Sequence, residues 1–128
     1  MKKDLKITTV KIYGNDTKVR ARALAAAGSD ARMSGCSLPV VINSGSGNQG
    51  ITVSVPVIEF AKKLKCSEEK LYRALVLSNL IAIHLKHGMG KLSAFCGVVS
   101  ASCGTGAGIT FLHTEDFDLI SQSITNTV

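Results

Sequence analysis

The chain has 128 residues, which is the length of one domain with a single core. Its composition is 45% hydrophobic but only 5% aromatic, with no tryptophan, so the apolar residues are chiefly Ala, Val, Ile and Leu, which suit close helix packing. The net charge of +6 comes largely from scattered lysines, and no arginine cluster interleaves with aromatic residues, so a solvated surface is favoured over a nucleic-acid interface. An attraction for anionic substrates is the main alternative.

Neither a membrane span nor a secretory signal is visible in the sequence. No apolar run reaches the ~20 residues that a span requires, and the basic N-terminus lacks the apolar segment of a signal peptide. We therefore expect a cytoplasmic protein without membrane association. Its four cysteines show neither CxxC nor zinc-finger spacing, so each is first interpreted as a small buried apolar residue.

The N-terminal part predicts an arm followed by a helix. Residues 4–13 alternate loosely and suggest a short strand or an extended arm. The Gly14-Asn15-Asp16 sequence is typical of a turn, and Asp16 or Thr17 can cap a helix over residues 19–33, which is rich in alanine. Asp30 and Arg32 lie near the end of this helix, where a surface role and a role in a site are equally favoured.

The most informative segment is the glycine-rich run at residues 43–50, which separates two apolar segments. It reads Asn43-Ser44-Gly45-Ser46-Gly47-Asn48-Gln49-Gly50. If a helix begins at Ile51, the loop ends at a helix N-terminus, where unpaired N–H groups favour a carboxylate or phosphate. The spacing also fits a dinucleotide fingerprint, but no second strand follows, so an anion or amide clamp with Asn48 and Gln49 as specific groups is favoured.

The remaining sequence predicts further helices. Residues 51–65 form one helix, with Pro56 early in it, and Ser67 caps the next, which runs to about Lys86. Residues 74–85 are apolar on nearly every side, which predicts a central position and favours a buried, hydrogen-bonded His84 over a ligand role. The last helix is expected to start at Thr114 and to run through Ile120 and Ile124.

A serine- and cysteine-rich helix is predicted over residues 91–103, before a flexible stretch at 104–108. Its polar face would carry Ser93, Cys96, Ser100 and Cys103. Such a face indicates either a tight seam between helices or a surface that presents a thiolate to a metal or substrate.

Four stretches in order carry a family resemblance: Ser29 to Gly35, the NSGSGNQGI run at 43–51, KLSAFCG at 91–97 and GAGI at 106–109. Together they resemble the iron–sulfur-dependent L-serine dehydratase alpha-chain-like family, specifically its L-cysteine desulfidase branch, over about residues 20–112. The resemblance implies an all-α helical bundle and an amino-acid lyase that forms pyruvate and ammonia with a [4Fe–4S] cluster, whose open iron acts as a Lewis acid on the leaving group.

The resemblance also implies site residues. Cys96 matches the first cluster cysteine, and the loop residues Asn43, Ser44, Gly45, Ser46, Gly47, Asn48 and Gln49 would hold the substrate carboxylate. Asp30, Arg32 and Ser93 would support the site from nearby, and no residue is assigned as the catalytic base. Cysteine and serine are both open as substrates.

The chain departs from the family pattern at both ends. The family's other two cluster cysteines lie in a CDGA-type segment beyond Val128, and its N-terminal half carries a CTEP-like motif that is not found here. We therefore expect residues 1–128 to be a single-domain fragment of the catalytic domain. It would be inactive and without a cluster alone, would need the missing segments or a companion subunit, and would self-associate as a homo-oligomer. The alternative is a degenerate module that binds a small anion or amino acid, or that mediates oligomerisation.

Overall fold

The computed structural model describes residue 14, residues 16–90 and residues 96–127. These residues form five helices: α2 (Thr17–Met33), α3 (Gly47–Leu64), α4 (Glu68–Met89), α5 (Gly97–His113) and α6 (Phe117–Thr125). No strand is present in the described ranges, so the expectation of an all-α bundle is confirmed. The arm or strand predicted for residues 4–13 lies outside the described residues.

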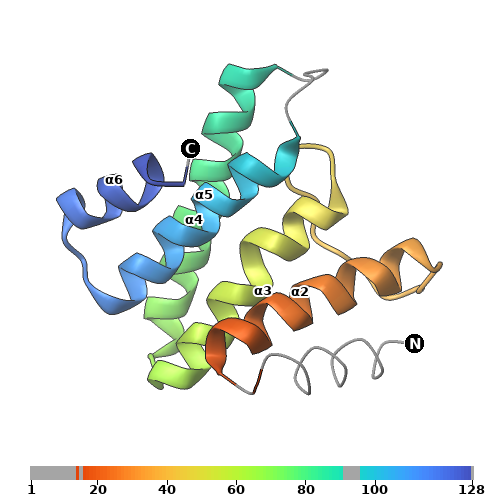
Figure 1. Cartoon of the computed structure of the whole chain (residues 1–128), viewed down its shortest axis with the longest axis horizontal. Helices are drawn as coiled ribbons and strands as arrows, with labels where there is room; N and C mark the ends of the chain where they lie inside the picture. The colour runs from red at the N-terminus through yellow and green to blue at the C-terminus, as the bar shows by residue number, and fades with distance from the viewer. Residues whose placement is uncertain (1–13, 15, 91–95, 128) are drawn as a thin grey trace.

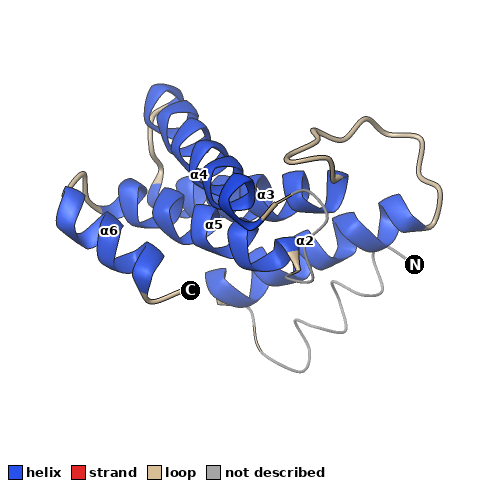
Figure 2. Cartoon of the chain, turned by 90° about the horizontal axis from the view of Figure 1, so that it is seen from above, coloured by secondary structure: helices blue, strands red, loops and turns tan. Residues whose placement is uncertain are grey.

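Helices α3 and α5 form the centre of the bundle. Helix α3 packs against α2, α4 and α5, and α5 packs against α3, α4 and α6. Helices α2 and α6 consequently lie at opposite sides of the molecule (Figures 1 and 2). The core side chains are small, because Val53 and Val57 of α3 are fully buried against alanines of α4 and α5. The described part contains no helix long and apolar enough to cross a membrane.

The helix starts follow the capping residues that the sequence offers. The carboxylate of Asp16 accepts a hydrogen bond from the Thr17 N–H at 2.7 Å, so α2 begins two residues earlier than predicted. The Ser67 hydroxyl accepts from the Lys70 N–H at 3.3 Å at the start of α4, as predicted. These caps satisfy N–H groups that have no partner within the helix.

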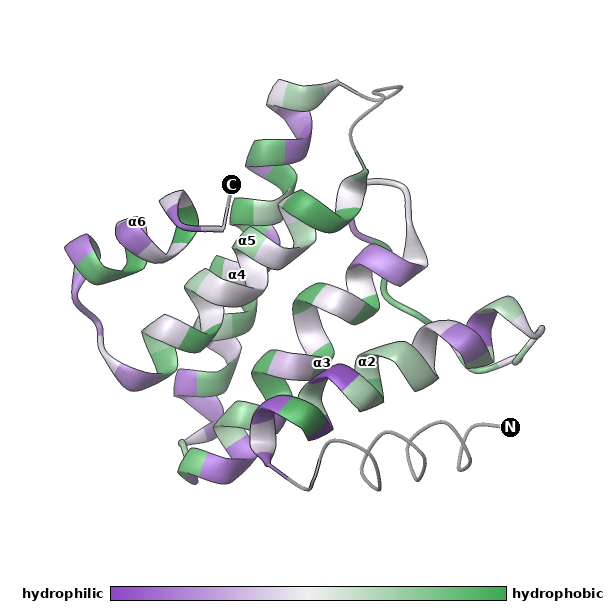
Figure 3. Ribbon diagram, in the orientation of Figure 1, coloured by the Kyte–Doolittle hydropathy of each residue, from purple (hydrophilic) through white to green (hydrophobic). Residues whose placement is uncertain are grey.

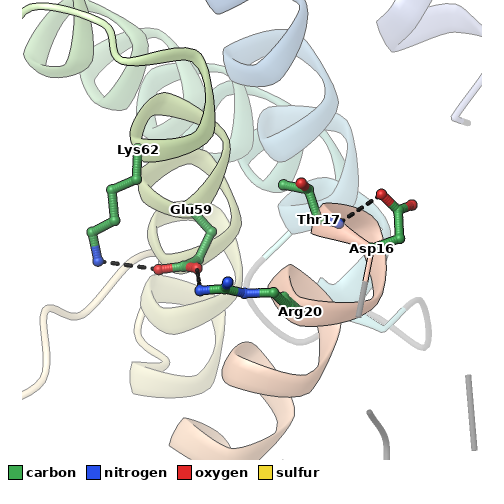
Figure 4. Close-up of polar contacts among 5 residues, drawn as sticks. All are labelled: Asp16, Thr17, Arg20, Glu59 and Lys62. Atoms are coloured by element: carbon green, nitrogen blue, oxygen red, sulfur yellow. Dashed lines mark hydrogen bonds and ion pairs between the residues drawn. The ribbon is translucent and has the colours of Figure 1, made fainter. Parts of the chain in front are cut away.

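An ion-pair cluster joins α2 to α3 (Figure 4). The residue Glu59 is only 8% exposed, and the two oxygens of its carboxylate contact Arg20 at 3.2 Å and Lys62 at 3.1 Å. A buried carboxylate requires such compensation. The pair therefore fixes how α2 lies along α3.

The seam between α4 and α5 is built from small residues, and it corrects the prediction for residues 91–108. The predicted helix is confirmed over residues 97–103, and residues 91–95 lie outside the described ranges. The flexible stretch over 104–108 is wrong, because α5 runs through all of 104–108 and ends at His113. A side chain at Gly104 would collide with the Ser78 carbonyl oxygen, and one at Gly108 would press on Ala74 and Ser78. These glycines therefore serve close packing rather than flexibility.

The prediction for α4 is also partly wrong. Only the face with Ala74, Ser78 and Ala82 is buried, while the large apolar residues Val76 and Leu80 are each 58% exposed. Green and purple residues accordingly alternate along the helix in Figure 3. His84 is exposed rather than buried. Because α4 contacts α3 and α5 chiefly through its small residues, Val76 and Leu80 face outward, while Leu71 and Leu75 pack partly buried against the core.

Candidate functional site

The glycine-rich segment begins with a tight turn over residues 43–46. The Asn43 N–H donates to the Ser46 carbonyl oxygen at 3.1 Å, and the Ser46 N–H donates back at 3.0 Å. The two central residues, Ser44 and Gly45, have φ values of 51° and 83°. Two consecutive positive φ values define a type I′ turn. Its tip, Ser44–Gly45, is exposed to solvent.

Asn43 fastens this turn to α4. Its side chain is 2% exposed, and its Nδ2 donates to the side-chain oxygen of Asn79 at 2.9 Å and to the Asn79 carbonyl at 3.3 Å. Its Oδ1 accepts from the Ser44 hydroxyl at 2.9 Å. Both ends of the Asn43 amide are therefore used within the fold, so this predicted binding residue positions the turn.

The second half of the segment is helical, which differs from the predicted start at Ile51. Helix α3 begins at Gly47, with Ser46 as its N-cap: the Ser46 hydroxyl accepts from the Gln49 N–H at 3.4 Å. Gly50 is fully enclosed, because a side chain there would collide with the Val41 carbonyl oxygen. Gly47, Asn48 and Gln49 thus form the first turn of α3 rather than part of the predicted loop.

Arg32 covers this first turn. Its Nη1 donates to the Asn48 side-chain oxygen at 3.2 Å. Its Nε lies only 2.5 Å from the position that a Cβ atom on Gly47 would take. The guanidinium therefore lies at the positive end of α3, where it adds to the attraction for an anion. Asp30, in the same helix, makes no side-chain hydrogen bond or ion pair to the described residues, so the structure does not join it to this site.

The start of α5 lies beside the start of α3 (Figure 1). The Gln49 side-chain amide fills the space that a side chain on Gly97 would occupy. Cys96 is the N-cap residue of α5, is exposed, and makes no side-chain cap hydrogen bond. The contact between Gln49 and Gly97 thus brings the glycine-rich segment next to Cys96, although 47 residues separate them.

Gln49 also contains an unsatisfied buried group. Its Oε1 is buried and accepts no hydrogen bond from the described residues. A buried carbonyl oxygen without a donor costs about 1–3 kcal/mol. Such a group marks a position where a donor from a ligand or from another segment would be stabilised.

The described part of the polar face predicted from Ser93 to Cys103 does not form one surface. Cys96 precedes the helix, and Ser93 lies outside the described residues. Ser100 and Cys103 are fully buried, and the Ser100 hydroxyl donates to the Gly97 carbonyl at 2.9 Å. Burial raises the pKa of the Cys103 thiol, which therefore stays protonated. The tight-seam interpretation is correct for these two residues.

The residues that the structure describes do not by themselves fit an iron–sulfur cluster. The described ranges hold no group of three or more His, Cys, Asp or Glu side chains that could bind a metal ion. Cys96 is the exposed cysteine among the four, whereas Cys36 and Cys66 are half-buried. The described part of the chain therefore offers one exposed cysteine, and further cluster ligands would have to come from elsewhere.

The sequence analysis missed Asn79. The sequence does contain a signal for this residue, because Asn79 is an asparagine within an apolar stretch of α4. Asparagine is a poor helix former, and a buried amide needs a hydrogen-bond partner. It also missed Lys86 and His87, which the structure places opposite the Ser44–Gly45 tip, on the wall of a hollow of about 540 Å³.

Comparison with known proteins places the chain in a family. It is 68% identical over 117 residues to a UPF0597 protein of Desulfitobacterium hafniense, 60% over 121 residues to one of Lachnoclostridium phytofermentans, and 55% over 115 residues to one of Fusobacterium nucleatum. These matches cover 91%, 94% and 90% of this chain but only 27%, 29% and 27% of the relatives, so it spans less than a third of their length. No solved structure matches the chain. The family model for the serine dehydratase alpha chain matches residues 1–128, and the chain therefore belongs to that family.

Proposed function

We propose that this chain supplies the substrate-binding end of an iron–sulfur-dependent amino-acid lyase. The reaction would eliminate hydrogen sulfide from L-cysteine or water from L-serine, and release pyruvate and ammonia. The observation that carries the proposal is the contact of Gln49 with Gly97, because it gathers the glycine-rich segment and the exposed Cys96 at one end of the bundle.

The groups at this end suit a small zwitterion. The positive end of α3 and the Arg32 guanidinium favour a carboxylate, as does a basic hollow beside the turn. The unsatisfied Oε1 of Gln49 would accept a hydrogen bond from the ammonium group of the substrate. The polar donors and acceptor thus match both charged ends of an amino acid.

Completion of the site would require segments beyond this chain. Cys96 would provide one ligand of the [4Fe–4S] cluster, and the other ligands would come from outside the described residues. The relatives are more than three times as long as the matched region, which leaves room for those segments in one polypeptide. A companion subunit could supply them equally well.

The test is a chimera in which this chain replaces the matching 117-residue segment of the Desulfitobacterium hafniense relative. Pyruvate would be measured with L-cysteine and with L-serine, and the unaltered relative is the reference. Even the mutation of a residue that only hydrogen-bonds to a metal ligand lowers metal affinity or activity about 10- to 100-fold. We therefore expect Cys96→Ser to lower the rate by more than about 100-fold, while Cys66→Ser, which alters a half-buried cysteine, leaves it nearly unchanged.

Full activity of the Cys96→Ser chimera would contradict the proposed role of this thiol. The second candidate is a non-catalytic module that binds a small amino acid, favoured by the lack of a three-ligand group in the described ranges. A chimera that binds L-serine without forming pyruvate, where the unaltered relative forms it, would support this second candidate.

A further inference from the structure

The outward side of α4 carries a row of exposed apolar side chains, which we call the α4 stripe. Its members are Tyr72, Val76, Leu80 and Ile83, which are 47–59% exposed. Their spacing of four, four and three residues places them along one side of the helix. Helices α3 and α5 are the described helices that pack against α4, and they contact its opposite, small-residue face. The stripe therefore lies at an edge of the bundle that no described helix covers (Figure 2).

Charged groups of opposite kind stand at the two ends of the α4 stripe. Glu69 precedes Tyr72 by three residues, and His87 follows Glu69 by 18 residues, which is five full turns of a helix. Both side chains therefore lie on the same side of α4 as the stripe, and both are exposed. Their neighbours in the sequence are Glu68 and Lys86, so the start of α4 is acidic and its last turn is basic.

The helix dipole explains the position of these charges within one chain. Acids in the first turn and bases in the last turn stabilise a helix whether or not anything binds to it. The dipole does not explain why four exposed apolar side chains stand in line between the charges. Single exposed apolar residues are ordinary, whereas a continuous exposed row marks an interaction surface.

The order of residues along this side of α4 is symmetric about position 78. Val76 and Leu80 each lie two residues from that position, and Glu69 and His87 each lie nine residues from it. If a second α4 helix lies against the first in the opposite direction, each apolar residue meets an apolar residue. At both ends of such a pair, an acidic turn meets a basic turn. This is the self-complementarity that a two-fold interface requires.

We propose that the α4 stripe binds a second copy of this chain, with the two α4 helices antiparallel about a two-fold axis near position 78. Val76 of one copy lies opposite Leu80 of the second copy, and Glu69 lies opposite His87 at each end. A parallel pair would instead set Glu69 against Glu69, and like charges repel. The end charges therefore select one orientation, and this inference does not depend on the proposed lyase activity.

The experiment measures the dissociation constant of the dimer by sedimentation velocity over a concentration series. Glu69→Lys and His87→Glu should each raise it about fivefold or more, because each places like charges at both ends of the interface, where exposed ion pairs stood. The double variant with both changes exchanges the two charges and should restore a dissociation constant close to that of the wild type. The differences should shrink at about 1 M NaCl, which screens exposed charges.

Asp118→Lys in α6 is the matched control for Glu69→Lys. Both positions are exposed acids in the first turn of a helix, so both substitutions disturb the helix dipole in the same way. We expect Asp118→Lys to leave the dissociation constant unchanged. Circular dichroism would show that each variant keeps the helical content of the wild type.

Three results would overturn the antiparallel pair. The first is a wild-type chain that stays monomeric over the whole concentration series. The second is a dimer that Glu69→Lys and His87→Glu leave unchanged, as a parallel pair or a different interface would behave. The third is a folded double variant that dimerises no better than the two single variants.

Discussion

The hydroxyl of Thr105 in α5 lies 2.8 Å from the carbonyl oxygen of Thr52 in α3. Pro56 follows Thr52 by four residues and has no N–H, so this carbonyl lacks the donor that a regular helix would supply. Thr105 provides a donor from the neighbouring helix, while it also lies 2.8 Å from the Ala101 carbonyl of its own helix. The proline thus creates a polar link between the two central helices.

Substitution of Thr105 by valine should lower the free energy of unfolding by about 1–3 kcal/mol, because it leaves a half-buried carbonyl without a donor. Urea unfolding followed by circular dichroism would measure the change. Thr110→Val in the same helix is the control, since the Thr110 hydroxyl makes no hydrogen bond to the described residues and is also half-buried. Equal losses in both variants would contradict the role assigned to Thr105.

The enclosed position of Gly50 predicts a large effect of one methyl group. In Gly50→Ala the new side chain would meet the Val41 carbonyl oxygen, and because that oxygen belongs to the backbone, the connection before α3 must shift. We expect a loss of about 1–3 kcal/mol, the usual cost of overpacking, and altered NMR signals for residues 41–46. Gly88→Ala in α4 meets nothing within 4 Å, so it should gain up to about 1 kcal/mol from helix propensity. A neutral Gly50→Ala would contradict the observed packing.

Burial of Cys103 predicts a loss of stability at alkaline pH. Its pKa is raised above the ordinary 9.0 in the folded chain, so the unfolded chain loses this proton first as the pH rises. The contribution of the protonated Cys103 thiol to the free energy of unfolding is therefore complete below about pH 8. It declines as the pH rises from the ordinary pKa toward the raised pKa of the folded state. Unfolding by urea at several pH values should show a steeper alkaline decline for the wild type than for Cys103→Ala. Parallel declines would contradict this prediction.

The outward apolar residues of α4 predict self-association. Val76, Leu80 and Ile83 lie on one side of the helix and are 58%, 58% and 47% exposed. Because exposed apolar patches commonly mark interfaces, we expect a dimer by sedimentation velocity. Leu80→Lys should weaken it, and Leu119→Lys on α6 is the control, with a similarly exposed leucine. A wild-type monomer at high concentration would contradict the prediction.

Local signals in the sequence were sufficient for much of the helical fold. Asp16 and Ser67 cap helices as their residue types predict, because an N-cap depends only on the next few residues. The glycines of α5 were misinterpreted because their role, unlike that of an N-cap, does not depend on neighbouring residues in the sequence alone. Gly104 and Gly108 disfavour a helix locally, but they lie four residues apart and admit α4 at close range. The benefit of this close packing depends on the partner helix, and helix propensity takes no account of a partner helix.

The candidate site was only partly predictable. The glycine-rich segment and Cys96 were identified from the sequence, but the contact of Gln49 with Gly97 and the hydrogen bonds between Asn43 and Asn79 depend on how helices pack. The second pair is separated by 36 residues. The exposed position of His84 was likewise unpredictable, because the apolar pattern of α4 is nearly uniform around the helix and does not indicate which side is buried.

The most direct test of a shared site is to measure whether Cys96 lies beside the glycine-rich segment in solution. A nitroxide spin label would be attached to Cys96 in a chain with Cys36→Ser and Cys66→Ser, since Cys103 is buried and protonated. We expect strong broadening of the amide signals of Gly47, Asn48 and Gln49, and little effect on residues 121–125 of α6. Sharp signals throughout residues 43–50 would contradict a single site formed by the starts of α3 and α5.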